Sequence, residues 1–263
     1  MKKINGNTLK LIACITMLVD HATAGIMLPV VRAGFYPDSI SFDTLNIIYK
    51  ILRGIGRNSF PIFCFLLVEG FIHTKSRLRY ALSLLIFGFI SEPFFDVCFY
   101  AREDVFNINI FSVIEQNMDL LTNKCNVYFT LLIGLLVIWG VEFVFDLVKR
   151  YNGNILISYG LGALVAGAGI YVAELLNTDY HGYGVFLIFV FYILRNYTPV
   201  NLIGAYLSIF SLGTEYLALP SFGLLYFYNQ KRGRRLGRLK YLFYAFYPVH
   251  IAVIIFIRCM IYG

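Results

Sequence analysis

Two basic side chains near the N-terminus are spaced so that they could serve one reaction. In KLIACITMLVDH, Lys10 and His21 are eleven residues apart. In an α-helix this separation is about three turns, which leaves the two side chains within roughly 20° of one another and about 16 Å apart along the axis. Lys10 could hold a phosphate-bearing donor at the mouth of a membrane helix, and His21 would lie near its middle.

Histidine is suited to act as a general base because its pKa lies near working pH, and the uncharged ring is the form that accepts a proton. His21 is therefore the predicted catalytic base. The alternative is a histidine bonded only to a neighbouring backbone carbonyl. Asp20 points about 100° away from His21 on a helix, so it is not automatically its partner; we class Asp20 as a candidate substrate-binding residue.

Further ionisable residues interrupt the second apolar run, RNSFPIFCFLLVEGFIHT. An ionisable group inside a membrane span costs several kcal/mol unless it is paired or hydrated, so its default interpretation is functional. Arg57 lies at the start of the run, Glu69 is expected to face a cavity, and His73 is expected at the boundary. The Glu69–His73 spacing is a weak metal signal without an HExxH motif, and we predict no metal site.

Later apolar runs add four polar candidates. Glu92 and Asp96 flank Pro93 in SEPFFD, where they form either a polar pocket at the outer mouth or an ion pair with Arg57; the two are compatible. His181 lies beside glycines in YHGYGV, and loop geometry explains it about as well as chemistry. His250 lies inside the last apolar run, in YAFYPVH, and is the second candidate for a functional histidine.

The composition indicates which elements position these residues. Hydrophobic residues make up 59% of the 263 residues and charged residues 14%, against about 25% charged in soluble domains. The mean hydropathy is +0.71. Apolar runs of about 20 residues suit helices that cross a bilayer, because lipid tolerates no unpaired backbone. The fold class is therefore an all-α, polytopic membrane bundle, and we expect a single domain over 1–263.

About nine transmembrane helices are predicted. The apolar runs lie near 9–31, 55–73, 79–100, 127–148, 154–176, 182–196, 199–213, 215–229 and 241–262. Basic residues recur in alternate loops, for example in KRGRRLGRLK at 231–240, which predicts a cytoplasmic N-terminus. The C-terminus is expected outside if all three short segments within 182–229 cross. This pattern accounts for the net charge of +7 without a nucleic-acid partner.

Two smaller features concern packing and covalent links. The run YGLGALVAGAGIY is rich in small residues, including Ala163 and Gly167, which predicts close helix–helix packing. Five cysteines show no CxxC spacing, so neither zinc nor a disulfide framework is expected, although one bond between Cys98 and Cys125 stays open.

The motifs together resemble the TraX family of bacterial membrane proteins, a family named for conjugative pilin acetylation. The resemblance extends almost end to end, through KLIACITMLVDH, RNSFPIFCFLLVEG, SEPFFD, NVYFT, HGYGV and YLFYAFYPVH. The family is also similar to the transmembrane acyltransferases of the acyltransferase-three group. Those proteins carry a basic residue, ten intervening residues and a histidine in an early span, the spacing of Lys10 and His21.

The resemblance implies a multi-pass protein of the bacterial cytoplasmic membrane that transfers an acetyl group. Acetyl-CoA would bind from the cytoplasm, and the acceptor would be a hydroxyl or amine of an extracytoplasmic glycan or pilin-like protein. Lys10 matches the donor-associated basic residue and His21 the catalytic histidine. Glu69 and Glu92 are grouped with His21 as catalytic candidates, and Arg57 with Lys10 as a cofactor-binding candidate.

The remaining roles are open at this stage. Arg57, Glu69 and Glu92 would line the acceptor side or hold the histidine. Asp96, His181 and His250 are grouped with Asp20 as substrate-binding candidates, and His250 is also the second histidine that an acyl-histidine relay would need. A secondary transporter or lipid flippase is the alternative function, because 182–229 contains three short segments of the kind that build transport sites. A non-catalytic assembly factor is the third.

Overall fold

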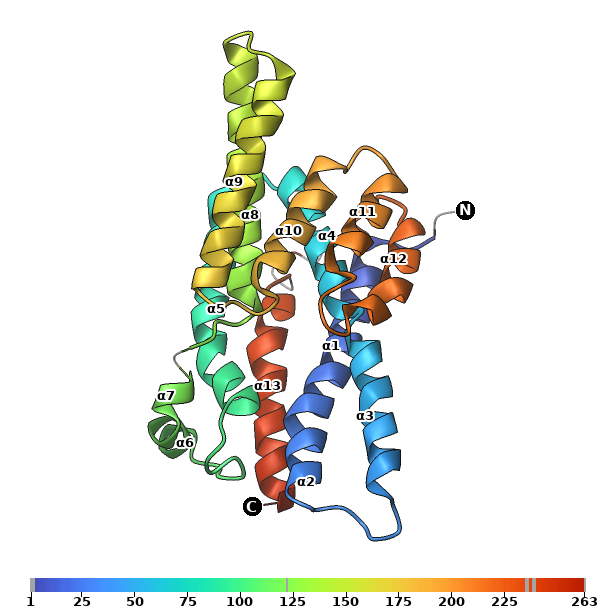
Figure 1. Cartoon of the computed structure of the whole chain (residues 1–263), viewed down its shortest axis with the longest axis vertical. Coiled ribbons are helices and arrows are strands. Elements are labelled where there is room, and N and C mark those ends of the chain that lie inside the picture. Colours follow the sequence, from blue (N-terminus) through green and yellow to red (C-terminus); the bar gives the residue numbers. More distant parts are fainter. Residues whose placement is uncertain (1–2, 122, 235–236, 238–239, 263) are drawn as a thin grey trace. The chain divides into compact units, whose positions relative to one another are not determined.

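The computed structural model describes residues 3–121, 123–234, 237 and 240–262, and these form helices joined by loops (Figure 1). Lys2, Arg235 and Arg238 of the predicted basic loops lie outside the described residues. Two isolated bridges, Ile4–Tyr228 and Cys125–Thr178, are the strand-like pairings within the described part. The all-α prediction is confirmed.

The helices are α1 (Gly6–Ala22), η1 (Thr23–Met27, a π-helix), α2 (Leu28–Arg32), α3 (Phe42–Gly56), α4 (Ser59–His73), α5 (Arg77–Phe99), α6 (Ile110–Gln116), α7 (Met118–Leu121), α8 (Val127–Arg150), α9 (Ile155–Leu175), α10 (His181–Ile193), α11 (Val200–Ile209), η2 (Glu215–Ala218, a 3₁₀ helix), α12 (Leu219–Tyr226) and α13 (Lys240–Tyr262).

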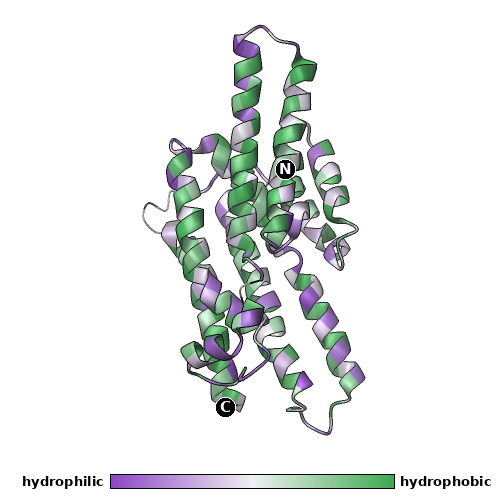
Figure 2. Ribbon diagram, turned by 60° about the vertical axis from the view of Figure 1, so that its left-hand side comes forward, coloured by the Kyte–Doolittle hydropathy of each residue, from purple (hydrophilic) through white to green (hydrophobic). Residues whose placement is uncertain are grey.

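The chain is a multi-pass membrane protein by the length and composition of its helices. Among the described residues, six helical stretches are long and apolar enough to cross a membrane: Gly6–Arg32, Phe42–His73, Arg77–Phe99, Val127–Arg150, Ile155–Leu175 and Tyr241–Ile261. All nine predicted runs contain helix, but α10, α11 and α12 are shorter than a full crossing requires. Hydrophilic residues are most frequent in the loops and at the helix ends (Figure 2).

The chain forms two compact units, each assembled from separate stretches of sequence. Unit 1 contains residues 1–63, 89–123 and 214–263, and unit 2 contains residues 64–88 and 124–213. The chain passes between the units at four places, within α4, within α5, in the loop before α8 and in the loop before η2. Every candidate residue from the first and last apolar runs belongs to unit 1.

In unit 1, α1 packs against both α3 and α13. The contacts of α1 and of η1, which follows it directly, advance in the same order along α13: Lys10 lies over the ring of Phe243, His21 contacts His250, and Gly25 of η1 lies against Ile254. The two helices therefore run parallel. Lys10 and His21 both face α13, which confirms that they share one face of α1.

Short polar side chains begin the helices of both units, as expected for residues that satisfy the first free backbone N–H groups. Asn5 accepts hydrogen bonds from the backbone of Asn7 and Thr8 at the start of α1, each at 3.0 Å. In unit 2, Asn126 accepts from Tyr128 N at the start of α8 and donates to the carbonyl of Gly88 on α5. The caps thus fix where α1 and α8 begin.

Unit 2 is built on the α8–α9 hairpin with α10 beside it and α11 against α10 (Figure 1). The small-residue packing predicted for α9 is present, but on a different face. Ala163 and Gly167 are exposed, and a Cβ on Gly167 would meet nothing within 4 Å. The buried small residues of α9 are Ser158, Gly162, Ala166, Gly169 and Ala173. A Cβ on Gly169 would lie only 2.1 Å from a methyl of Val137, so glycine there permits the close approach of α8.

All five cysteines are free thiols, and four of them are buried. Cys98 and Cys125 are both free thiols, so the disulfide left open by the sequence is not formed. The cysteines of α1, α4, α5 and α13 act as small apolar packing residues.

Candidate active site

The centre of unit 1 holds two histidines in direct contact. Nδ1 of His21 on α1 lies 2.7 Å from Nε2 of His250 on α13, and Nδ1 of His250 lies 2.6 Å from the carbonyl oxygen of Phe246. Three aromatic rings enclose the pair. Phe99 and Tyr247 meet the His21 ring edge-on, at centroid distances of 5.1 and 5.6 Å, and Phe246 stacks on His250 at 4.6 Å. His250 is 5% exposed, so this contact is part of the unit's interior.

A local change of helix type follows directly after His21. The π-helix at Thr23–Met27 widens the helix by one residue per turn, a feature that often occurs at functional sites. Thr23 donates its hydroxyl to the carbonyl of Val19 at 2.6 Å. The backbone of Gly25 then approaches α5 and α13 so closely that a Cβ there would lie 2.6 Å from Cys98 Sγ and 2.7 Å from Ile254. The segment after His21 is therefore held tightly against both neighbours.

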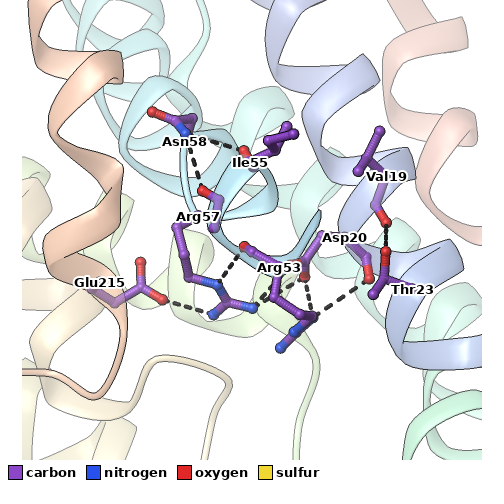
Figure 3. A network of polar contacts seen from close by, with 9 residues as sticks. Val19, Asp20, Thr23, Arg53, Ile55, Arg57, Asn58 and Glu215 are labelled. Carbon is purple, nitrogen blue, oxygen red and sulfur yellow. Dashed lines mark hydrogen bonds and ion pairs between the residues drawn. The ribbon is translucent and has the colours of Figure 1, made fainter. Parts of the chain in front are cut away.

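Asp20 points away from the histidine pair into a cluster of four charged residues, which we call the charge cluster: Asp20, Arg53, Arg57 and Glu215. Figure 3 shows the Asp20 carboxylate between the two guanidinium groups. Arg53 Nη1 donates to Asp20 Oδ2 at 2.6 Å, and Arg57 Nη2 donates to Asp20 Oδ1 at 3.0 Å. Arg57 Nη1 donates to Glu215 Oε1 at 2.7 Å. Two cations and two anions balance, which is the condition for burying such groups.

The charge cluster forms because α3 ends beside α1. Arg53 and Arg57 are one turn apart, so both side chains leave the same face of α3. Gly56 lies so close to Asp20 that a Cβ there would be 2.1 Å from Oδ1. Asn58 completes the junction. Its amide donates to the carbonyls of Gly54 and Ile55 (Figure 3). Its side-chain oxygen accepts from Ser221 N at the start of α12.

At the N-terminal end of α1, the basic segment 231–234 is hydrogen-bonded along the helix start. Gly6 N donates to Lys231 O at 2.9 Å, Asn7 N donates to Arg232 O at 3.1 Å, and the Asn7 amide donates to Arg234 O at 2.8 Å. All three basic residues of this segment are exposed. Lys10 lies one turn further along α1, with its ammonium 5.5 Å from the centroid of the Phe243 ring. We call Lys10 and the segment 231–234 the basic rim, and the face of α1 that leads to His21 begins there.

Glu92 and Asp96 lie in unit 1, on the face of α5 that carries Phe99, because residues spaced i, i+4 and i+7 share a helix face. Asp96 is buried, and its Oδ1 has no hydrogen-bond partner among the described residues. Arg57 forms ion pairs with Asp20 and Glu215, and its predicted pairing with the acids of SEPFFD stays a prediction. The sequence did not indicate either Asp20 or Glu215 as a partner of Arg57.

Arg258 is a further buried cation in unit 1, and it is 1% exposed. Nη1 donates to the carbonyls of Gly25 and Cys98 at 3.1 and 3.0 Å, and Nη2 donates to Val97 O at 3.2 Å. The last carbonyls of a helix lack intrahelical donors and carry partial negative charge, so Arg258 stabilises the end of α5 and joins it to η1.

Glu69 and His181 belong to unit 2, and their predicted roles stay predictions. The carbonyl of Glu69 lies 2.8 Å from Nδ1 of His73, a contact within one helical turn. His181 starts α10 with a positive φ of 48°, and its Nδ1 lies 3.6 Å from Glu174 Oε2. Glu174 Oε1 accepts from Gly182 N at 2.9 Å, so this acid contacts the first turn of α10.

Comparison with known proteins identifies the family of the chain. The model of the family described as TraX protein matches residues 5–258, a range that includes Lys10, both paired histidines, the charge cluster and Arg258. The chain belongs to the TraX family. This TraX family member is also 27% identical over 267 residues to a probable fimbrial assembly protein FimC, serogroup H1, from Dichelobacter nodosus, a match that covers 94% of the chain and 92% of that relative. No solved structure matches it.

Sequence reasoning missed three residues of this site in the TraX family member. The sequence analysis singles out none of Arg53, Glu215 and Arg258. The one-turn spacing of Arg53 and Arg57 was an available signal for a shared anionic partner. No sequence pattern indicated that the segment at 215 would supply the second anion.

Proposed function

We propose that this chain is a membrane-embedded acetyltransferase. It would move an acetyl group from acetyl-CoA in the cytoplasm to a hydroxyl or amine on the outer side of the bacterial cytoplasmic membrane. Membership of the TraX family supports the reaction class. The name of the fimbrial assembly relative favours a pilin-like protein as acceptor over a cell-surface glycan.

The observation that carries the proposal is the arrangement of Lys10 and His21 along α13. Both residues lie on one face of an uninterrupted helix, and both contact α13, Lys10 at Phe243 and His21 at His250. A donor with its phosphates at the basic rim and its thioester reaching along this face would bring its carbonyl to the His21 ring. The length of the pantetheine arm of CoA suits the three helical turns between the two residues.

The transfer itself requires a base at the attacked carbonyl. The oxygen or nitrogen of the acceptor bonds to the acetyl carbon while His21 takes the proton from that hydroxyl or amine. The carbon–sulfur bond then breaks, and the CoA thiolate leaves with the proton that His21 had accepted. The products are the acetylated acceptor and CoA thiol, and the histidine returns to its starting state.

The charge cluster supports this reaction by fixing how α1 is turned. Asp20 and His21 are adjacent, so their side chains leave α1 about 100° apart. Ion pairs from Asp20 to Arg53 and Arg57 hold one face of α1 against α3, and the neighbouring face then presents His21 to α13. In this proposal Arg57 positions the base through Asp20, in addition to any contact with a substrate.

The test is donor binding and transfer by the purified protein in lipid vesicles. We expect saturable binding of acetyl-CoA, and transfer of its labelled acetyl group to a peptide amine or sugar hydroxyl supplied at the other side. CoA without the acetyl group should compete for the same site. A folded protein that binds neither compound at millimolar concentration contradicts the proposal and favours the transporter or flippase alternative.

A further inference from the structure

The geometry of the two histidines determines which nitrogen of each ring carries a proton. The ring planes differ by 11°, the centroids are 4.9 Å apart, and the nearest nitrogens are 2.7 Å apart. The centroid separation exceeds the nitrogen–nitrogen separation by about the width of one imidazole ring, which is twice the distance from a ring centroid to a ring nitrogen. Both centroids and both nitrogens therefore lie nearly on one line. Because the planes are also nearly parallel, the rings lie edge to edge in nearly one plane rather than face to face. This is the alignment of an N–H···N hydrogen bond.

The direction of that hydrogen bond follows from the carbonyl of Phe246. A backbone carbonyl only accepts hydrogen bonds, so Nδ1 of His250, 2.6 Å away, must carry a hydrogen. An uncharged imidazole carries one ring hydrogen, which leaves a lone pair on Nε2 of His250. The contact with His21 then requires a hydrogen on Nδ1 of His21, which donates to His250. The lone pair of His21 is therefore on Nε2.

We propose that His250 is a positioning residue that holds His21 in this tautomer and keeps the Nε2 lone pair directed at the substrate. The proposal rests on the acetyltransferase function above and names the reacting atom within it. A histidine whose second nitrogen donates to a fixed acceptor has its ring orientation and its basic nitrogen decided by that acceptor. Here the acceptor is a second histidine, which is itself oriented by a backbone carbonyl.

The same geometry argues against His250 as a second acyl carrier. Formation of an acyl-histidine needs a ring nitrogen with an available lone pair. Nε2 of His250 directs its lone pair at His21, and Nδ1 of His250 donates to Phe246. Among the contacts of the described residues, Nε2 of His21 is the one ring nitrogen of the pair that has no hydrogen bond within the protein. Direct transfer with a single base fits this arrangement.

During the reaction the hydrogen bond between the rings becomes charge-assisted. His21 gains a proton on Nε2 from the acceptor and is positively charged while the acceptor bonds to the acetyl carbon. Its Nδ1–H then donates to Nε2 of His250 from a cation, and such hydrogen bonds are about twice as strong as neutral ones. When the CoA thiolate leaves with the Nε2 proton, both rings return to the uncharged state with their original tautomers.

The first experiment reads the tautomers directly and does not depend on activity. The chain contains four histidines, so a His73→Gln, His181→Gln double variant leaves only the pair. Nitrogen-15 NMR of this variant, labelled at histidine in lipid vesicles, should show Nδ1–H and an unprotonated Nε2 for both rings. An Nε2–H form of either ring overturns the proposal. Because no substrate is needed, this result is separate from success or failure of the acetyltransferase assignment.

The second experiment uses two amides of different reach at position 250. The glutamine amide extends to where Nε2 of the imidazole lies, so its oxygen can accept from His21 Nδ1; the asparagine amide reaches only the position of Nδ1. We expect His250→Gln to keep kcat within about tenfold of the original chain, with unchanged KM for acetyl-CoA. His250→Asn should lose about 10²–10⁴-fold in kcat, the loss typical of a misplaced general base.

Folding and relay are distinguished by the same pair of variants. Both amides are uncharged and similar in size, so equal thermal unfolding temperatures would assign the activity difference to the contact with His21. An acyl carrier cannot be replaced by an amide, so loss of activity in His250→Gln equal to that in His250→Asn, with both variants folded, overturns the positioning role.

Discussion

The ionisable side chains of unit 1 and unit 2 differ in how far along the chain their partners lie. In unit 1, His21 contacts His250, and Arg57 joins Asp20 to Glu215. In unit 2, His73 contacts the carbonyl of Glu69 one turn earlier, and Arg195 lies on the ring of Tyr192, 4.1 Å from its centroid.

Contacts between neighbours in sequence form in almost any helix and therefore say little about function. Contacts between distant segments require the whole unit to fold before they exist. Unit 2 also has long-range polar contacts, but those from Asn126 and Thr130 join uncharged side chains to backbone carbonyls. Its long-range ion pair, between Arg77 and Glu142, has side chains that are 33% and 29% exposed. The difference teaches that burial combined with separation in sequence, rather than the mere presence of ionisable residues, identifies the candidate site.

The largest expected effect separates the histidines of the two units. His21→Ala should reduce acetyl transfer by about 10²–10⁴-fold because it removes the general base. His73→Ala is the control, since His73 is exposed and bonded only within its own helix turn, and it should change the rate by no more than about twofold. Initial rates of acetyl transfer in vesicles measure both effects. Equal losses of rate in the two variants would contradict the catalytic role given to His21.

The ion pairs provide the next comparison, measured by thermal or chemical unfolding in detergent. Asp20→Asn leaves Arg53 and Arg57 without their shared anion at a buried site, and should cost about 3–5 kcal/mol of unfolding free energy. Glu142→Gln breaks the more exposed pair of unit 2 and should cost no more than about 1 kcal/mol. A smaller loss for Asp20→Asn than for Glu142→Gln would contradict the structural role given to the charge cluster.

Two arginines test the same contrast for cations. Arg258→Leu removes the donor to three backbone carbonyls in the interior and should destabilise the protein by about 3 kcal/mol. Arg195→Leu removes mainly a contact with an aromatic ring, worth about 0.5–1 kcal/mol. The measurement is the unfolding temperature of each variant, compared with that of the original chain. A partial recovery of the unfolding temperature in Arg258→Lys would assign the loss in Arg258→Leu to the missing donor.

The smallest effect concerns the donor end of unit 1. Lys10→Ala should raise KM for acetyl-CoA by about tenfold with little change in kcat, because the ammonium contributes one charged contact to a phosphate. Lys3→Ala is the matched control, since Lys3 is exposed and lies before the start of α1. If Lys10→Ala lowers only kcat, then Lys10 does not anchor the donor.

Much of the fold could be predicted because apolar runs decide where membrane helices form. Each of the nine runs contains a helix, and the shared face of Lys10 and His21 follows from helical spacing alone. The packing face of α9 could not be predicted in the same way. Small residues occur on more than one face of that helix, and only contact with α8 shows that Gly162 and Gly169 are the buried ones.

The site was predictable in part for a related reason. His21 and His250 are ionisable residues inside apolar runs, and such residues draw attention by themselves. Their contact depends on α1 and α13 packing together, which one sequence without homologues does not reveal. Arg53, Glu215 and Arg258 lie near the ends of apolar runs, where a charge usually faces water or lipid headgroups. Only the folded unit shows that they are partnered inside it.

The parallel course of α1 and α13 has a consequence for how the chain is threaded through the bilayer. Successive crossings alternate in direction, so two parallel crossings are separated by an odd number of others. The six long apolar stretches alone would make the last antiparallel to the first. The parallel pairing therefore predicts that the short helices α10, α11 and α12 together supply an odd number of crossings, although each is shorter than a straight crossing requires. With that number, the two termini would lie on opposite sides of the membrane.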